Sequence, residues 1–162
     1  MTLAVAIRGE TGLIVAADRR MLEEDGTIHE VGKVYGIGKV TYVPCGDGAQ
    51  TAKFVKKVSE LTDLDGFEDF DDAMAVLDLC LQMKESKGSF SVLVVDDTTR
   101  RVFLGDCGYW NEIEQPFVAI GSGSGMAYGY FHTCDVPNLD DMFEVVASVN
   151  ASVSEEYDVY EI

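Results

Sequence analysis

The chain has 162 residues, 47% of them hydrophobic and 25% charged, a balance typical of one globular domain with a sizeable core. Its formal net charge of −17 repels phosphate backbones and so argues against nucleic acid as a partner. No apolar run approaches the ~20 residues of a membrane helix, and the start MTLAVAIRGE lacks the basic leader of a signal peptide, so we expect a cytoplasmic protein without a membrane partner.

The first part of the chain predicts antiparallel hairpins. Leu3–Arg8 and Leu13–Ala17 are apolar runs joined by a short glycine-containing loop, and Asp18 ends the second run. Lys33–Ile37 and Val40–Val43 form a similar pair. These runs indicate two successive hairpins.

From residue 48 the apolar spacing changes to that of helices. One apolar face is expected at Ala52, Val55, Val58 and Leu61, and a second helix is expected over 70–81 with an aspartate near its start. The sequence 90–95 is continuously apolar, which predicts a strand buried on both faces, and 101–104 returns beside it.

The last part predicts a strand, two helices and a final strand. The strand 117–120 leads into GSGSG at 121–125, which opens a helix through about His132, and the chain ends in an alternating strand over 157–162. Asn138 or Asp140 is expected to cap the last helix. The residues expected to face inward from it are Met142, Val145, Val146, Val149 and Val153. Strand pairs followed by helix pairs, twice, predict a single α+β domain over 1–162, with two stacked antiparallel sheets and helices outside.

No metal or cofactor is expected. The cysteines and histidines are too far apart in the sequence to form a zinc or redox motif: Cys45, Cys80, Cys107, Cys134, His29 and His132. The GSGSG segment lacks both the Walker lysine and the full G-x-G-x-x-G spacing, which argues against nucleotide binding. Free thiols in a reducing compartment fit this pattern.

Thr2 is the first candidate for chemistry. Methionine is normally removed before a small residue, and its removal would leave an amine and a β-hydroxyl on one residue. An amine with a pKa of about 7.7–8.0 can act as the general base for that hydroxyl. Because many proteins begin with Met-Thr, this feature alone is weak.

Three further positions fit the same chemistry. A lysine ammonium at Lys33 would favour a neutral amine, and a strand-end carboxylate at Asp18 can balance its charge. Gly46, at a strand-to-helix turn, lets a backbone N–H approach a reacting carbonyl, and the hydroxyl of Ser122 can support the amine. Taken singly, each has an ordinary explanation as a surface charge or a tight turn.

In combination these residues resemble a known family. Thr2 at the head of a strand, Asp18 in LIVAADRR, Lys33 in GKV, Gly46 in CGDGAQ and Ser122 in VAIGSGSGMAYG are similar in order and spacing to the β-type subunits of the proteasome. They also resemble the peptidase subunit of its simpler bacterial ATP-dependent homologue, and the similarity covers nearly the whole chain. The family's fold is the four-layer αββα sandwich of N-terminal-nucleophile (Ntn) hydrolases, so the resemblance implies that fold.

The resemblance also implies roles. Thr2 would be the nucleophile of a threonine peptidase, Lys33 and Asp18 would tune its amine, and Gly46 would bind the oxyanion. Ser122 would position the amine, helped by an acidic residue near the C-terminus, with Glu156 the first choice and Asp158 the second. The specificity pocket would map near Met21, Val31, Tyr35, Pro44 and Gly48.

The resemblance further implies a homo-oligomeric ring that encloses the sites, peptide or unfolded protein as substrate, and a possible ATPase unfoldase partner. Three features depart from the family. Ile162 comes soon after the last strand begins, Asp47 stands where a second glycine is common, and a retained Met1 would block the amine. The alternative is therefore a catalytically inactive scaffold subunit of a ring, although five matching residues favour catalysis.

Overall fold

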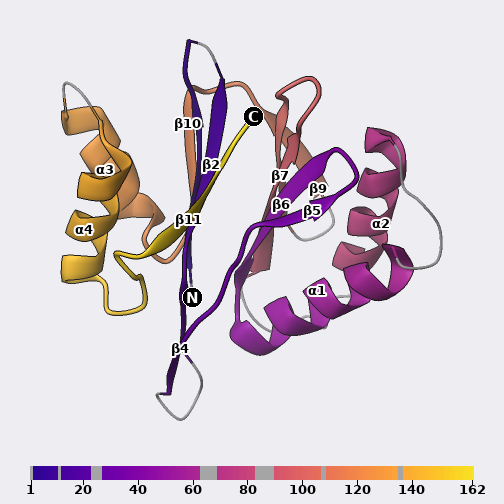
Figure 1. Ribbon diagram of the computed structural model, residues 1–162, viewed down its shortest axis with the longest axis horizontal. Coiled ribbons are helices and arrows are strands. Elements are labelled where there is room, and N and C mark those ends of the chain that lie inside the picture. Colours follow the sequence, from indigo (N-terminus) through magenta and orange to yellow (C-terminus); the bar gives the residue numbers. More distant parts are fainter. Residues whose placement is uncertain are drawn as a thin grey trace. The chain divides into compact units, whose positions relative to one another are not determined.

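The computed structural model describes residues 2–10, 12–22, 27–62, 69–82, 90–106, 109–134 and 137–162. Its contacts group into two compact units. The terminal unit comprises Met1–Val34 with Gln115–Ile162, and the central unit comprises Tyr35–Glu114. Each unit contains one large antiparallel sheet and two helices, and the terminal unit also has a two-stranded hairpin (Figure 1).

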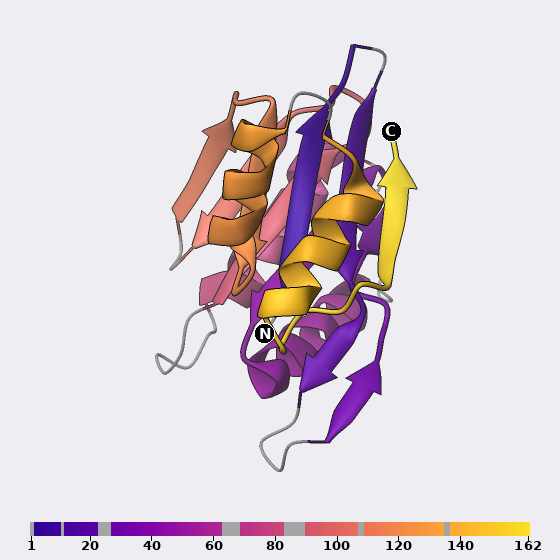
Figure 2. The ribbon, with the colours of Figure 1, turned by 90° about the vertical axis from the view of Figure 1, so that its left-hand side faces the viewer.

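The terminal unit is built on a four-stranded antiparallel sheet in the order β10-β1-β2-β11. Its strands are β1 (Leu3–Arg8), β2 (Leu13–Asp18), β10 (Phe117–Gly121) and β11 (Tyr157–Glu161). A small hairpin, β3 (Arg20–Leu22) with β4 (Ile28–Glu30), follows β2. The helices α3 (Ser124–Thr133) and α4 (Leu139–Val149) cover one face of the sheet (Figure 2).

The core of this unit forms because apolar side chains on alternate strand positions meet the inward faces of the helices. Leu3 and Val5 of β1 pack against Met142, Phe143 and Val146 of α4. All five side chains are at most 2% exposed. This packing fixes the start of β1, and with it Thr2, against a rigid layer.

The central unit is a five-stranded antiparallel sheet in the order β5-β6-β7-β8-β9, covered by two helices. Its strands are β5 (Tyr35–Ile37), β6 (Val40–Gly46), β7 (Phe90–Asp96), β8 (Val102–Asp106) and β9 (Tyr109–Ile113), and its helices are α1 (Gly48–Thr62) and α2 (Phe70–Gln82). Aromatic rings from sheet and helix meet in the core, as in the Phe54–Phe90 pair at 5.1 Å between centroids. As predicted, the 90–95 run is a mostly buried strand.

Several expectations about these elements are wrong in detail. Val145 and Val149 are 48% and 65% exposed, because the inward face of α4 is centred on Phe143 and Val146, and Val145 lies about 100° around the helix from Val146. Val153 is buried but lies beyond the end of α4. In α1, Ala52 is exposed, and the larger Phe54 is buried with Val58.

Strand boundaries also differ from expectation. The strand expected to start at Lys33 begins at Tyr35, and its partner extends to Gly46. β3, β4 and β9 are not predicted by the apolar pattern, because all three are short and β4 and β9 are largely exposed. Asn138 caps α4 as expected, accepting hydrogen bonds from the backbone N–H groups of Asp140 and Asp141.

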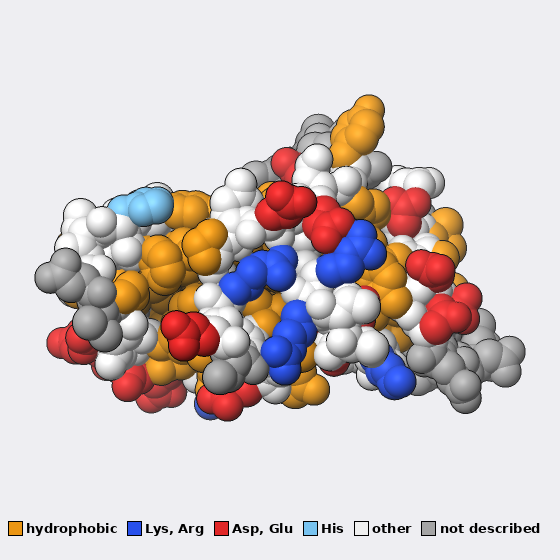
Figure 3. Space-filling model, turned by 90° about the horizontal axis from the view of Figure 1, so that it is seen from above, with side chains coloured by type: hydrophobic (Ala, Val, Ile, Leu, Met, Phe, Trp, Pro, Cys, Tyr) orange, Lys and Arg blue, Asp and Glu red, His pale blue; other side chains and the backbone are white. Residues whose placement is uncertain are grey.

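On one face of the molecule, acidic side chains are spread over several places (Figure 3). On the face seen in Figure 3, red carboxylate side chains are separated by basic and apolar ones. Among the helices of the described residues, none is long and apolar enough to cross a bilayer. Of the described cysteines, Cys45 and Cys80 are buried, and Cys134 is partly exposed.

Candidate functional site

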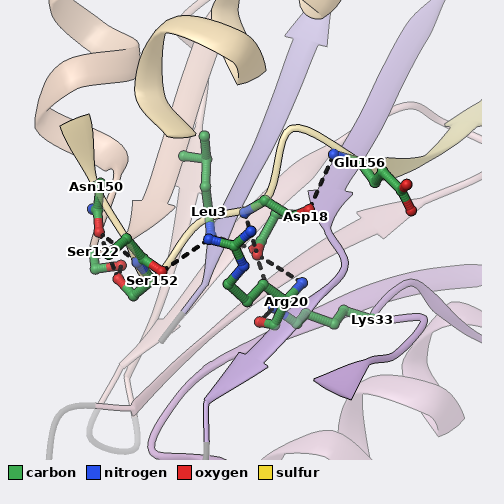
Figure 4. A network of polar contacts seen from close by, with 10 residues as sticks. Leu3, Asp18, Arg20, Lys33, Ser122, Asn150, Ser152 and Glu156 are labelled. Carbon is green, nitrogen blue, oxygen red and sulfur yellow. Dashed lines mark hydrogen bonds and ion pairs between the residues drawn. The ribbon is translucent and has the colours of Figure 1, made fainter. Parts of the chain in front are cut away.

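A buried carboxylate stands at the centre of the polar network of the terminal unit (Figure 4). Asp18, the last residue of β2, is fully buried. Its Oδ1 accepts a hydrogen bond from the Leu3 N–H at 2.7 Å, and its Oδ2 accepts from the N–H groups of Arg20 at 3.1 Å and Ser154 at 3.3 Å. One side chain therefore ties together the start of β1, the start of β3 and the segment before β11.

Lys33 completes this centre as a buried cation. Its side chain is 5% exposed, and its Nζ donates to Asp18 Oδ1 at 3.1 Å and to the Arg20 carbonyl. Burial raises the pKa of the Asp18 carboxyl above its ordinary value, while the Lys33 charge and the Leu3 and Ser154 N–H groups oppose that rise. Because Lys33 and Leu3 N–H bond to the same oxygen, the ammonium lies within two hydrogen-bond lengths of the peptide nitrogen that joins Thr2 to Leu3.

The hairpin after β2 explains how Lys33 returns to this point. Arg20 of β3 is paired with Glu30 of β4, and the Val31 N–H donates to the Arg19 carbonyl at 2.8 Å. The chain therefore comes back beside β2 just before Lys33. Neither strand of this hairpin was predicted, although the pairing of Asp18 with Lys33 was.

Thr2 is held by its backbone against the end of β10. It is 5% exposed, and its carbonyl accepts the Ser122 N–H at 2.8 Å. Gly121, at φ +95°, makes this approach possible, because a Cβ there would lie 1.9 Å from the Thr2 carbonyl oxygen. Thr2, Asp18, Lys33 and Ser122 are thus gathered in the terminal unit.

A second polar chain begins at Ser122 and was missed at the sequence level. The Ser122 and Ser152 hydroxyl oxygens are 3.0 Å apart, and Ser152 Oγ donates to Asn150 Oδ1 at 2.6 Å. Between these two residues, the Ala151 carbonyl accepts a hydrogen bond at 3.0 Å from the Arg20 guanidinium. The only sequence signal was the polar run N-A-S-V-S directly after an apolar helix.

The two acidic candidates near the C-terminus are less buried than Ser152 and Ser154. Glu156 is exposed, and its carboxylate points away from the Asp18–Lys33 pair (Figure 4). It joins the network through its backbone, accepting from the Arg19 N–H at 3.0 Å and donating to Ser154 Oγ at 3.1 Å. Asp158, on β11, forms an ion pair with Arg19 at 3.8 Å.

The remaining predicted residues are divided between the units. Met21 lies on β3, and Val31, just after β4, is partly buried. In the central unit, Tyr35 stacks on Tyr42, Pro44 is buried in β6, and Gly48 opens α1.

Gly46 ends β6 with φ +152°, a backbone conformation that favours glycine. Asp47 caps the helix that follows. Its Oδ1 accepts the Ala49 and Gln50 N–H groups, each at 3.1 Å. The Asp47 carboxylate is therefore hydrogen-bonded to the first turn of α1.

Over the described ranges, no three His, Cys, Asp or Glu side chains group as a metal ion would require. The chemistry available at this site is that of hydroxyls, a carboxylate and a buried ammonium. A buried ammonium can lower the pKa of a nearby amine and stabilise an oxyanion.

Comparison with known proteins gives structural relatives only. No family model matches the sequence, and no curated protein matches it. Among solved structures, eukaryotic HslV from Trypanosoma brucei is 15% identical with a TM-score of 0.71, and the alignment covers 98% of each chain.

Two structures of Anbu from Hyphomicrobium sp. strain MC1 are also similar. A Gly-1 mutant is 22% identical with a TM-score of 0.76, covering 99% of this chain and 82% of that one. The second is 19% identical with a TM-score of 0.77, covering 99% and 81%. The chain therefore has an α+β fold similar to that of HslV and Anbu, which confirms the α+β class predicted from the sequence.

Proposed function

We propose that this chain is a threonine peptidase that uses Thr2 as its N-terminal nucleophile once Met1 has been removed. The observation that carries the proposal is the buried Lys33–Asp18 pair, which is bonded to the backbone of the residue that follows Thr2. A lysine held at 5% side-chain exposure beside an N-terminal residue is costly to bury, and a role in catalysis accounts for it. The fold shared with HslV is compatible with this reading.

In the proposed reaction, the Thr2 hydroxyl oxygen attacks the peptide carbonyl carbon and its proton passes to the Thr2 amine. Lys33 lowers the pKa of that amine, which leaves it neutral and able to accept the proton. The oxyanion of the tetrahedral intermediate is held by a backbone N–H, for which we assign Gly46. The intermediate collapses to an acyl ester on Thr2 as the leaving nitrogen takes the proton, and water then hydrolyses the ester.

Asp18 orients Lys33, and Ser122 positions the amine. We retain Glu156 and Asp158 as candidates for an acidic member of the site, and Met21, Val31, Tyr35, Pro44 and Gly48 as the pocket for the substrate side chain. A peptide or unfolded protein is the proposed substrate. A homo-oligomeric ring with an ATPase unfoldase is the proposed setting.

The test combines intact mass with covalent labelling. The purified protein should lack Met1 and should gain one adduct from an epoxyketone, a reagent that needs both the hydroxyl and the amine of Thr2. Thr2→Ala, which still permits methionine removal, should take no adduct and should fold normally. Thr2→Ser, which keeps the hydroxyl, should still be labelled.

Lys33→Met should lose labelling although Met1 is still removed, so that Thr2 is the first residue of the variant. If the assembled protein retains Met1 and takes no adduct, the peptidase assignment fails, and a non-catalytic ring subunit is the reading that replaces it. Glu156→Gln and Asp158→Asn, assayed with a fluorogenic peptide, separate the two acidic candidates, since only the functional one should reduce kcat.

A further inference from the structure

The hydrogen bonds that lead away from Ser122 have a defined direction. Asn150 Oδ1 lies 3.1 Å from the Ser152 backbone nitrogen and 2.6 Å from Ser152 Oγ. A backbone N–H can only donate, so the Asn150 atom facing it is the carbonyl oxygen rather than the amide nitrogen. That oxygen can only accept, and Ser152 therefore gives its single hydroxyl proton to Asn150.

The single hydroxyl proton of Ser152 also fixes the direction of its hydrogen bond with Ser122. The Ser152 oxygen, having used its proton, faces Ser122 Oγ at 3.0 Å only as an acceptor. Ser122 must therefore donate its own proton to Ser152. The Ser122 hydroxyl is left with lone pairs alone, and its residue is bonded to Thr2 through the Ser122 N–H at 2.8 Å from the Thr2 carbonyl.

We propose that Asn150 and Ser152 are positioning residues that hold the Ser122 hydroxyl as an acceptor toward the Thr2 amine. This inference rests on the proposed function. An amine that serves as general base needs its lone pair free for the Thr2 hydroxyl proton. A Ser122 that accepts an amine N–H leaves that lone pair free, whereas a Ser122 that donates would occupy it.

The relay is uncharged and runs from an exposed Ser122 to a buried Ser152 and a half-buried Asn150. Ser152 is 6% exposed, and the relay ends on a neutral amide. The charged groups around it in the described residues are Arg20, whose guanidinium bonds the Ala151 carbonyl, and the Asp18–Lys33 pair. The hydrogen bonds from Ser122 thus end on a neutral side chain, whereas the family resemblance implies an acidic residue.

The test compares Ser152→Ala with Asn150→Asp, which keeps an acceptor at the end of the relay. Ser152→Ala should lower kcat about tenfold with KM nearly unchanged, since one hydrogen bond of this kind is worth about a factor of ten. It should also lower the pKa of the Thr2 amine, because Ser122 is then free to donate to the neutral form. Asn150→Asp should keep most of kcat and raise the pKa of the amine.

The matched control is Ser148→Ala, which removes a hydroxyl bonded to the Val145 carbonyl on the exposed side of α4 and should change neither quantity. The pKa of the amine is measured from the pH dependence of N-terminal acylation, on protein whose Thr2 is exposed by cleaving an N-terminal fusion. This measurement needs no peptidase activity, so it tests the effect of Asn150 and Ser152 on the amine pKa even if the wild type is not labelled by epoxyketone. An amine pKa in Ser152→Ala equal to that of the wild type, or an equal loss in Ser152→Ala and Asn150→Asp, overturns the relay.

Discussion

Replacing Lys33 with methionine probes the buried pair directly. Methionine keeps an unbranched apolar chain but removes the charge, which leaves Asp18 buried without its cation. Removing one partner of a buried ion pair costs roughly 3–5 kcal/mol. Asp18 would still accept three backbone N–H bonds, from Leu3, Arg20 and Ser154. We therefore expect the low end of that range, about 3 kcal/mol at pH 7.

The pH dependence of this loss has a definite sign. Burial raises the pKa of Asp18 and the Lys33 charge is the largest influence that lowers it, so Lys33→Met raises that pKa further. A carboxyl whose folded pKa exceeds its unfolded value contributes stability below the unfolded pKa and loses it as pH rises through the folded pKa. The deficit of Lys33→Met should therefore be small near pH 4 and grow toward pH 7.

Urea unfolding followed by circular dichroism, at matched protein concentration and at both pH values, measures this deficit. Lys39→Met is the control, because Lys39 is exposed and its replacement should change the free energy of unfolding by no more than about 0.5 kcal/mol. A deficit that is equal at both pH values, or larger at low pH, would show that Asp18 and Lys33 do not interact as described.

Three further substitutions test neighbouring features. Gly121→Ala should destabilise the protein by about 3 kcal/mol or prevent folding, because φ is +95° there and the new Cβ would lie 1.9 Å from the Thr2 carbonyl oxygen. The control is Gly129→Ala, in open space on α3, which should be neutral or slightly stabilising in the same thermal melt. Asp47→Ala should lower the stability by about 1 kcal/mol through loss of the α1 cap, and an unchanged melting temperature would contradict that role. Tyr157→Phe should remove from the ultraviolet alkaline titration a tyrosine with a pKa of about 12, a value raised by burial and by its hydrogen bond to Asp140. The neutral phenol stabilises the fold below pH 10 and that stability is lost as pH rises toward 12, so the variant should lose less stability over this window.

The buried strands and the Asp18–Lys33 pair were predictable because each leaves a local signal. Apolar runs such as 13–17 and 90–95 have few alternatives to a buried strand. Asp18 follows one such run directly, and a charge placed at the end of a buried strand must find a partner.

The rest of the site depends on contacts between residues far apart in the sequence. Ser154 meets Asp18 across 136 positions, and Arg20 meets the Ala151 carbonyl across 131. No periodicity reports such a contact, and serines after a helix are ordinary in loops. The family resemblance directed attention to Glu156 and Asp158, whereas the side-chain network runs through Asn150 and Ser152, and Ser154 donates its backbone N–H to Asp18.

The dependence of Asp18 on Ser154 has a consequence for biosynthesis. During translation, the residues around Thr2 and Lys33 leave the ribosome long before the segment that donates the Ser154 N–H. Until that segment arrives, the carboxylate lacks one of its donors and Ser122 lacks Ser152. A nascent chain therefore lacks part of the polar network around Thr2 until residues 150–154 have emerged, and the proposed activity would have to wait for that segment to fold.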